Sequence, residues 1–69
     1  MEELHDCRNR LVCMGDPITG LVESLYKGHK TSTYLAVGEE FKIERQDVVT
    51  TITLTNKGTF NVESHIVAA

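Results

Sequence analysis

The feature that most constrains the fold is a period-two pattern between Val48 and Val67. Apolar residues alternate with threonine or with other polar residues on both sides of the sequence Asn56-Lys57-Gly58. Such alternation is typical of strands with one buried and one solvated face, and asparagine and glycine are common turn residues. The segment therefore predicts a β-hairpin.

Two segments before this hairpin carry the same pattern. Residues 31–37 and 40–44 predict two further strands, the first broken by Gly38. The apolar residues of the predicted strands that turn inward form one core. The predicted core residues are Phe41, Ile43, Ile52, Leu54, Phe60 and Val62. Residues 2–8 are compatible with one helical turn or with an extended arm.

Residues 11–26 allow two interpretations. Residues 15–20 include Asp16 and Pro17 and separate two apolar runs, which favours a hairpin whose loop is built on a type I turn. In the alternative, Asp16 caps a helix that begins at Pro17 and carries an apolar stripe. Gly20 weakens this helix, because a glycine inside a helix costs about 1 kcal/mol relative to alanine. The hairpin is therefore the preferred prediction.

The length of the chain limits the fold class. The 69 residues form one small domain, residues 1–69, and a domain of this size buries only about 60% of the surface of its unfolded chain. Five or six short strands must curl to cover their apolar faces. The predicted fold is all-β or mostly β: a small antiparallel barrel, SH3-like or OB-like, or a strongly twisted meander, with a short N-terminal helix as an option.

Charge and apolar content argue against several classes of protein. Seven Lys and Arg stand against ten Asp and Glu, whereas a dedicated nucleic-acid binder usually has a basic excess. No apolar run approaches the roughly 18–20 residues that cross a bilayer, and the acidic N-terminus does not resemble a signal peptide. We expect a cytoplasmic protein without membrane contact, of a size common in bacteria and their phages, in which Cys7 and Cys13 stay reduced.

Residue types that support catalysis are present, but their spacing is not typical of a catalytic or metal site. His5, Cys7 and Cys13 contain no Cys-x-x-Cys pair, so no metal site is predicted. The glycines do not form a phosphate loop, and a small β domain has little room for a pocket of the ~300 Å³ that ligands usually need. We therefore expect a non-enzymatic protein without a cofactor. A thiol- or metal-dependent activity of the two cysteines is the third hypothesis.

Basic and aromatic residues lie together in one predicted loop region. These residues are Tyr26, Lys27, His29, Lys30 and Tyr34. Surfaces that bind single-stranded nucleic acid combine the same residue types, so a nucleic-acid-associated regulator is the second hypothesis. A solvated hairpin loop explains the cluster equally well, and nucleic acid is not the expected partner of this acidic chain.

The threonines of the predicted hairpin favour a contact function. Thr51, Thr53 and Thr55 form an uncharged strand face or edge, and an uncharged edge is a template for pairing with another chain. Aromatic residues are scarce, so burial against a second copy would add to a small core. The leading hypothesis is a small non-enzymatic β domain that acts by contact with another protein or with itself. The sequence identifies neither the partner nor the biological process.

One part of the chain shows a resemblance to a known family. Residues 35–43, with Gly38 and Glu39 at their centre, and residues 49–54 resemble the second half of the swapped-hairpin DNA-binding barrels of bacterial transition-state regulators and antitoxins. This resemblance implies a small DNA-binding barrel. The basic, proline-containing first half of that pattern is absent here, so no family is assigned.

Overall fold

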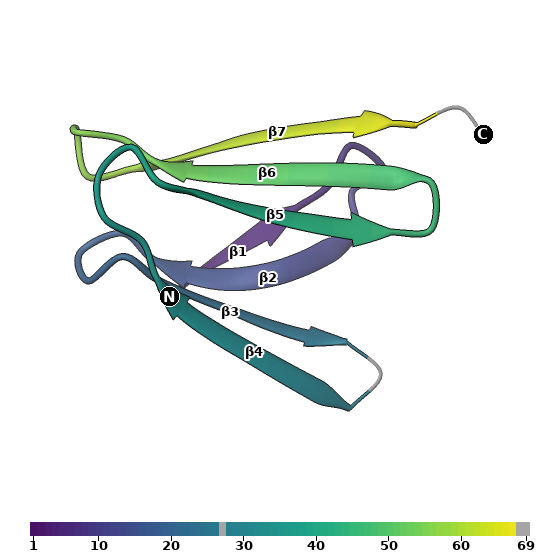
Figure 1. Ribbon diagram of the computed structural model, residues 1–69, viewed down its shortest axis with the longest axis horizontal. Coiled ribbons are helices and arrows are strands. Elements are labelled where there is room, and N and C mark those ends of the chain that lie inside the picture. Colours follow the sequence, from purple (N-terminus) through teal and green to yellow (C-terminus); the bar gives the residue numbers. More distant parts are fainter. Residues whose placement is uncertain (27, 68–69) are drawn as a thin grey trace.

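The protein is built from antiparallel strands. The computed structural model describes residues 1–26 and 28–67. The strands are β1 (Glu2–His5), β2 (Leu11–Asp16), β3 (Leu21–Tyr26), β4 (His29–Tyr34), β5 (Glu40–Arg45), β6 (Val48–Leu54) and β7 (Phe60–Ile66). They form one sheet in the order β1-β2-β3-β4 and a second in the order β5-β6-β7 (Figure 1). Within the described ranges, no helix has the length and apolar character that would let it span a membrane.

The core lies between the two sheets. Its buried members are Leu4, Val12, Cys13, Val22, Leu35, Ile43, Ile52 and Leu54. All six predicted core residues belong to this core or pack against it. Ile43, Ile52 and Leu54 are buried, and the remaining three predicted residues pack against the core with part of their surface exposed: Phe41, Phe60 and Val62. The alternation along β6 follows the period-two pattern residue by residue.

The mostly-β prediction is confirmed, and several of its details are wrong. The hairpin of residues 11–26 forms as β2 and β3, so the alternative helix does not occur there. The described chain has seven strands instead of five or six. Residues 2–5 form β1, so the extended alternative for the N-terminal segment is observed there and the helical turn is not. β1 forms because Leu4 is buried beside its partner Cys13 on β2. Leu4 and Cys13 meet only in the folded protein, and the weak apolar pattern of residues 2–8 does not predict their contact.

The strands do not close into a barrel. Leu35 donates its N–H to the carbonyl of Gly20 at 2.8 Å, at the end of the β3–β4 ladder, and the chain then turns at Val37 and Gly38. The strand predicted for residues 31–37 is therefore observed at His29–Tyr34. After the turn the chain joins β6, not β4, so both β4 and β5 remain sheet edges.

Two glycines are required by close approach of other parts of the chain. Gly15 lies within β2 and not in the predicted turn. The ring of Phe60 occupies the space that a side chain at this position would need. A Cβ atom on Gly15 would lie 2.7 Å from Cε2 of Phe60. Gly20 has φ +81°, and a Cβ atom there would overlap the carbonyl oxygen of Leu35. These contacts fix how the β2–β3 hairpin meets its neighbours.

Candidate functional site

β4 is an exposed edge strand without unpaired charge. Of its six residues, only Thr33 is partly covered. β4 contains no carboxylate, and its one lysine, Lys30, forms an ion pair with Glu23 on β3 at 2.8 Å. The hydrogen bond from Lys30 lowers the pKa of Glu23, and the same bond raises the pKa of Lys30. The lysine charge is thus compensated within the chain.

The other sheet edges in the described chain carry charge. β1 contains Glu2 and Glu3, β7 contains Glu63, and β5 contains alternating Glu and Lys residues. Charged side chains on edge strands oppose pairing with another chain. Of the four sheet edges, β4 is therefore the one that is best suited to pairing.

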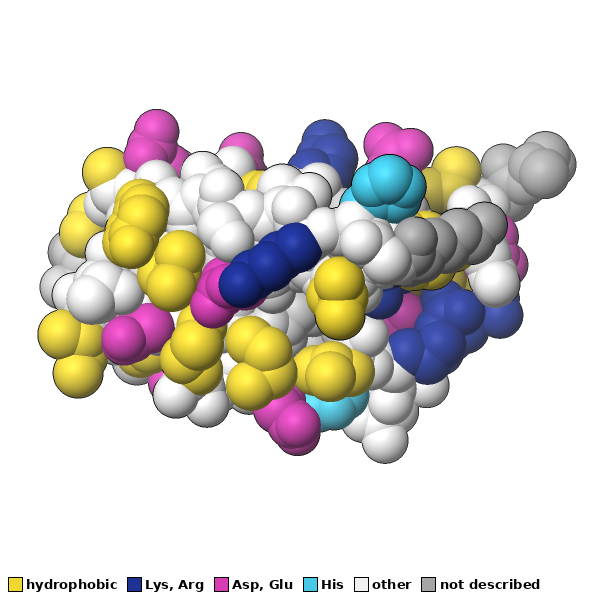
Figure 2. Space-filling model, turned by 90° about the horizontal axis from the view of Figure 1, so that it is seen from below, with side chains coloured by type: hydrophobic (Ala, Val, Ile, Leu, Met, Phe, Trp, Pro, Cys, Tyr) yellow, Lys and Arg dark blue, Asp and Glu magenta, His cyan; other side chains and the backbone are white. Residues whose placement is uncertain are grey.

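Apolar side chains gather on the face of the four-stranded sheet that points away from the core. The strand register places Met14, Leu21, Leu25 and Tyr34 there, and Leu25 and Tyr34 are 68% and 69% exposed. Part of the face is hollowed into a groove of about 420 Å³, so the expectation that a domain of this size has little room for such a volume is wrong. Apolar residues of this groove include Met1, Leu11, Met14 and Leu25. Figure 2 shows apolar side chains lying side by side over much of one view of the molecule.

We call these side chains the outer apolar face. It consists of Met1, Leu11, Met14, Leu21, Leu25 and Tyr34. Glu23 lies between Leu21 and Leu25 on the outward side of β3, and its ion pair with Lys30 is at the groove, so a polar element divides the apolar surface. Large exposed apolar side chains beside polar ones are typical of interaction sites. The order of residues along the chain does not reveal this face, because its members come from Met1, from β2, β3 and β4, and meet only in the fold.

The residues predicted to bind nucleic acid do not share one surface. Tyr26 pairs with His29, and both face the second sheet, whereas Lys30 and Tyr34 face outward. The guanidinium of Arg45 lies over the Tyr26 ring at 4.5 Å. Lys27 lies outside the described residues. Because a stacking surface needs its aromatic and basic groups together, the four described residues give the nucleic-acid hypothesis no common platform.

The predicted threonine edge is wrong, although the threonine face exists. β6 is the central strand of its sheet, and Thr51 and Thr53 each pair with residues on both β5 and β7. The backbone of β6 therefore has no free edge. The two side chains are partly exposed on the sheet surface, among charged partners such as Lys42 and Glu63. Thr55 lies beyond the strand and its hydroxyl is 2.8 Å from that of Thr59. A contact role for this face remains a prediction.

The cysteines differ in environment. Cys13 is part of the core, and burial raises the pKa of its thiol to about 11. It is therefore protonated at neutral pH, unlike the thiolates of catalytic cysteines. Cys7 is exposed in the loop after β1. In residues 1–26 and 28–67, no group of three His, Cys, Asp or Glu side chains is arranged to hold a metal ion.

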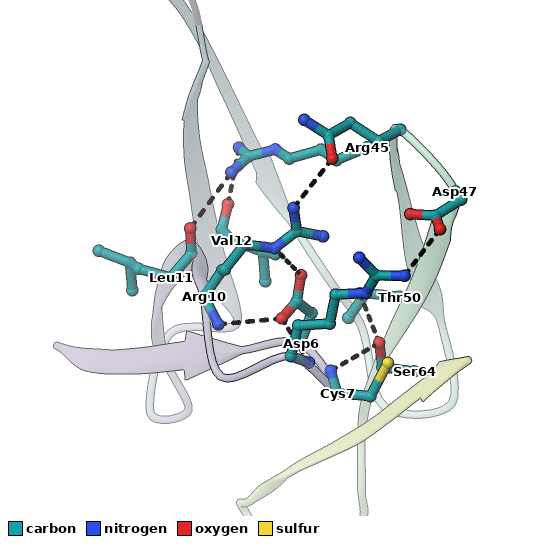
Figure 3. A network of polar contacts seen from close by, with 11 residues as sticks. Asp6, Cys7, Arg10, Leu11, Val12, Arg45, Asp47, Thr50 and Ser64 are labelled. Carbon is teal, nitrogen blue, oxygen red and sulfur yellow. Dashed lines mark hydrogen bonds and ion pairs between the residues drawn. The ribbon is translucent and has the colours of Figure 1, made fainter. Parts of the chain in front are cut away.

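A polar network that the sequence did not predict orders the loop between β1 and β2 (Figure 3). The side chain of Asp6, only 1% exposed, accepts a hydrogen bond from Arg10 Nε at 3.0 Å. It also accepts hydrogen bonds from the backbone N–H groups of Arg8 and Arg10, each at 2.9 Å. The backbone of Cys7 donates to Ser64 Oγ at 3.0 Å, which ties this loop to β7.

Arg45 joins the two sheets at the same end of the molecule. Its guanidinium donates from β5 to the carbonyls of Leu11 and Val12 on β2, at 3.2 and 3.0 Å, and to Ser24 Oγ on β3, at 3.0 Å. These acceptors are neutral and belong to the opposite sheet. Arg45 therefore fixes how the sheets meet, and its role here is structural.

We expect the protein to lose stability in acid through Asp6. The backbone N–H of Arg10 is the main group that holds the pKa of Asp6 below its ordinary value of 3.8, and Arg8 N–H and the Arg10 guanidinium add to it. A carboxyl with a lowered folded-state pKa stabilises the fold above its unfolded pKa, and that stabilisation disappears as pH falls through the folded value. Urea unfolding should therefore show a falling free energy below about pH 4.

A matched pair of variants tests whether Asp6 is responsible for the loss of stability in acid. Asp6→Asn should be less stable than the wild type at neutral pH and should show a weaker dependence on acid. Glu44→Gln, which alters an exposed carboxylate on β5, should keep the wild-type dependence. An Asp6→Asn protein whose stability declines in acid as steeply as that of the wild type would contradict the assignment.

No family model, no curated protein and no solved structure matches this chain.

Proposed function

We propose that this chain acts by protein–protein contact, with the outer apolar face as its binding surface. The observation that carries the proposal is the exposure of two large side chains on this face: Leu25, which lines the apolar groove, and Tyr34, on the neighbouring strand. Large apolar and aromatic side chains at the centre of an interface provide most of its binding energy. The partner that fits is a protein surface that places an apolar side chain in the groove and a polar group near the Glu23–Lys30 pair.

The rest of the proposal keeps the expectations drawn from the sequence, a cytoplasmic and non-enzymatic role. Its non-enzymatic part is supported by the buried Cys13 thiol, which is protonated at neutral pH, and by the predominantly apolar groove. Convergent polar groups with shifted pKa values are the usual mark of a catalytic site. In the groove, the one ionic pair, Glu23 with Lys30, is internally compensated.

A double variant tests the contact function. Leu25→Ser with Tyr34→Ser removes the two most exposed members of the face, and should leave the fold intact because both side chains are largely in solvent. A protein captured from native cell extract by the wild type, then purified, should bind the double variant at least tenfold more weakly, an effect on the order of 1.4 kcal/mol or more.

The control changes an exposed apolar residue on the other sheet. Ile66 on β7 is 55% exposed, and Ile66→Ser should bind that partner as the wild type does. If the double variant binds as tightly as the wild type, the outer apolar face is not the binding surface. If no protein binds the wild type, the contact function itself is wrong.

A further inference from the structure

The free edge of β4 can be assigned residue by residue. The N–H of Leu35 donates to the carbonyl of Gly20, which defines a hydrogen-bonded pair at the end of the β3–β4 ladder. Bonded and non-bonded pairs alternate along an antiparallel ladder, so Thr31 and Thr33 direct their backbone groups toward β3. The residues whose N–H and C=O groups point away from β3 are then Lys30, Ser32 and Tyr34.

We infer that β4 pairs with β4 of a second copy of this chain, antiparallel, about a two-fold axis at Ser32. The pairing joins two four-stranded sheets into one continuous sheet. In this register Ser32 faces Ser32 of the partner subunit, and Lys30 faces Tyr34 of the partner subunit. The inference deepens the proposed function, on which it rests, by naming a second copy as one partner.

This register is selected by hydrogen bonding and by charge. It gives every free residue of the edge a partner, with roughly six backbone hydrogen bonds across the axis. A register centred on Lys30 would place two lysines directly opposite each other, and like charges in that position are unfavourable. Centred on Ser32, the edge places the lysine against the tyrosine ring, and its charge is already paired with Glu23.

The pairing also extends the proposed binding surface. Leu21, Leu25 and Tyr34 lie on the outward face of β3 and β4. Strands added at the β4 edge keep the same outward face, because directly paired residues share a side of the sheet. The outer apolar faces of both copies would therefore adjoin on one side of the joined sheet.

A proline at the axis tests the pairing without disturbing the β3–β4 ladder. Ser32→Pro removes an N–H that points away from β3, and proline is tolerated on edge strands in this orientation. Light scattering and sedimentation of the wild type should show a monomer–dimer equilibrium, with a thermal midpoint that rises with protein concentration. Ser32→Pro should raise the dissociation constant roughly tenfold or more.

Two further measurements separate this pairing from other dimers. Thr53→Lys, on the face of β6, should leave the dissociation constant unchanged. Backbone amides of Lys30, Ser32 and Tyr34 should gain protection from hydrogen exchange as concentration rises, while those of Thr31 and Thr33 stay protected throughout. A dimer lost in Thr53→Lys, or one that leaves the three amides unprotected, would show that another surface associates.

The outcome also distinguishes this inference from the proposed function. A wild type that remains monomeric at millimolar concentration overturns the pairing. If such a monomer still binds its purified partner through Leu25 and Tyr34, the contact function is supported and only the β4–β4 pairing is wrong. If Ser32→Pro abolishes dimerisation while the double variant binds every captured partner normally, the pairing stands and the outer apolar face loses its role.

Discussion

Replacing Gly20 with alanine should destabilise the protein by about 3 kcal/mol or more, comparable to the whole stability of a domain this small. Two costs combine at this position. A φ of +81° is unfavourable for alanine, and the new Cβ would overlap the carbonyl oxygen of Leu35. The obstacle is backbone, so it cannot rotate away as a side chain could. The overlap is removed only if the start of β3 moves away from the end of β4. That movement breaks the 2.8 Å hydrogen bond from the N–H of Leu35 to the carbonyl of Gly20.

Gly58→Ala is the matched control for this substitution. Gly58 also has a positive φ, +74°, but a Cβ atom there would meet nothing within 4 Å. The left-handed conformation alone costs about 1–2 kcal/mol. Urea unfolding of both variants, at a concentration where the chain is monomeric, should show a clearly larger loss for Gly20→Ala. Equal losses would mean that Leu35 does not approach Gly20 as described.

The second large effect is expected at the centre of β6. The side chain of Ile52 is fully buried, with 0% exposure, and lies in the core between the sheets. Truncation to alanine should cost about 2–5 kcal/mol, because it removes buried methyl groups and leaves a cavity. Thermal unfolding should then show either a strongly lowered midpoint or no folded protein at all.

The neighbouring residue supplies the control. Thr53 follows Ile52 on the same strand and points to the opposite, partly exposed face. Thr53→Ala should change the unfolding free energy by only a few tenths of a kcal/mol. Since a one-residue slip in register exchanges the two faces of a strand, similar effects at the two positions would show that the register of β6 is displaced.

The same alternation explains why we place the proposed contact surface on the four-stranded sheet. The outward residues of β5, β6 and β7 are mostly charged or polar, and Val49 is the apolar exception among the paired outward positions. The outward residues of β2, β3 and β4 include methionine, leucine and tyrosine, and β4 has no carboxylate. The two sheets thus share one core while their outer faces differ in polarity.

Patterns among neighbouring residues determined most strands of this protein. Period-two alternation predicts the β6–β7 hairpin and β5, whereas the turn residues between two apolar runs favour the β2–β3 hairpin. The alternation also places Ile43, Ile52 and Leu54 inward. Alternation reports the two faces of a strand, which is a local property.

The tertiary structure alone decided which elements meet. β1 exists because Leu4 packs into a core assembled from other strands, and Asp6 is buried because loop donors converge on its carboxylate. β6 became a central strand and β4 an edge, which removed the predicted threonine edge and left an edge whose one lysine is paired with Glu23. The outer apolar face likewise arises only when β2, β3 and β4 lie side by side. Alternation cannot reveal these features, because it records which side of a strand is buried but not which strand lies next to it.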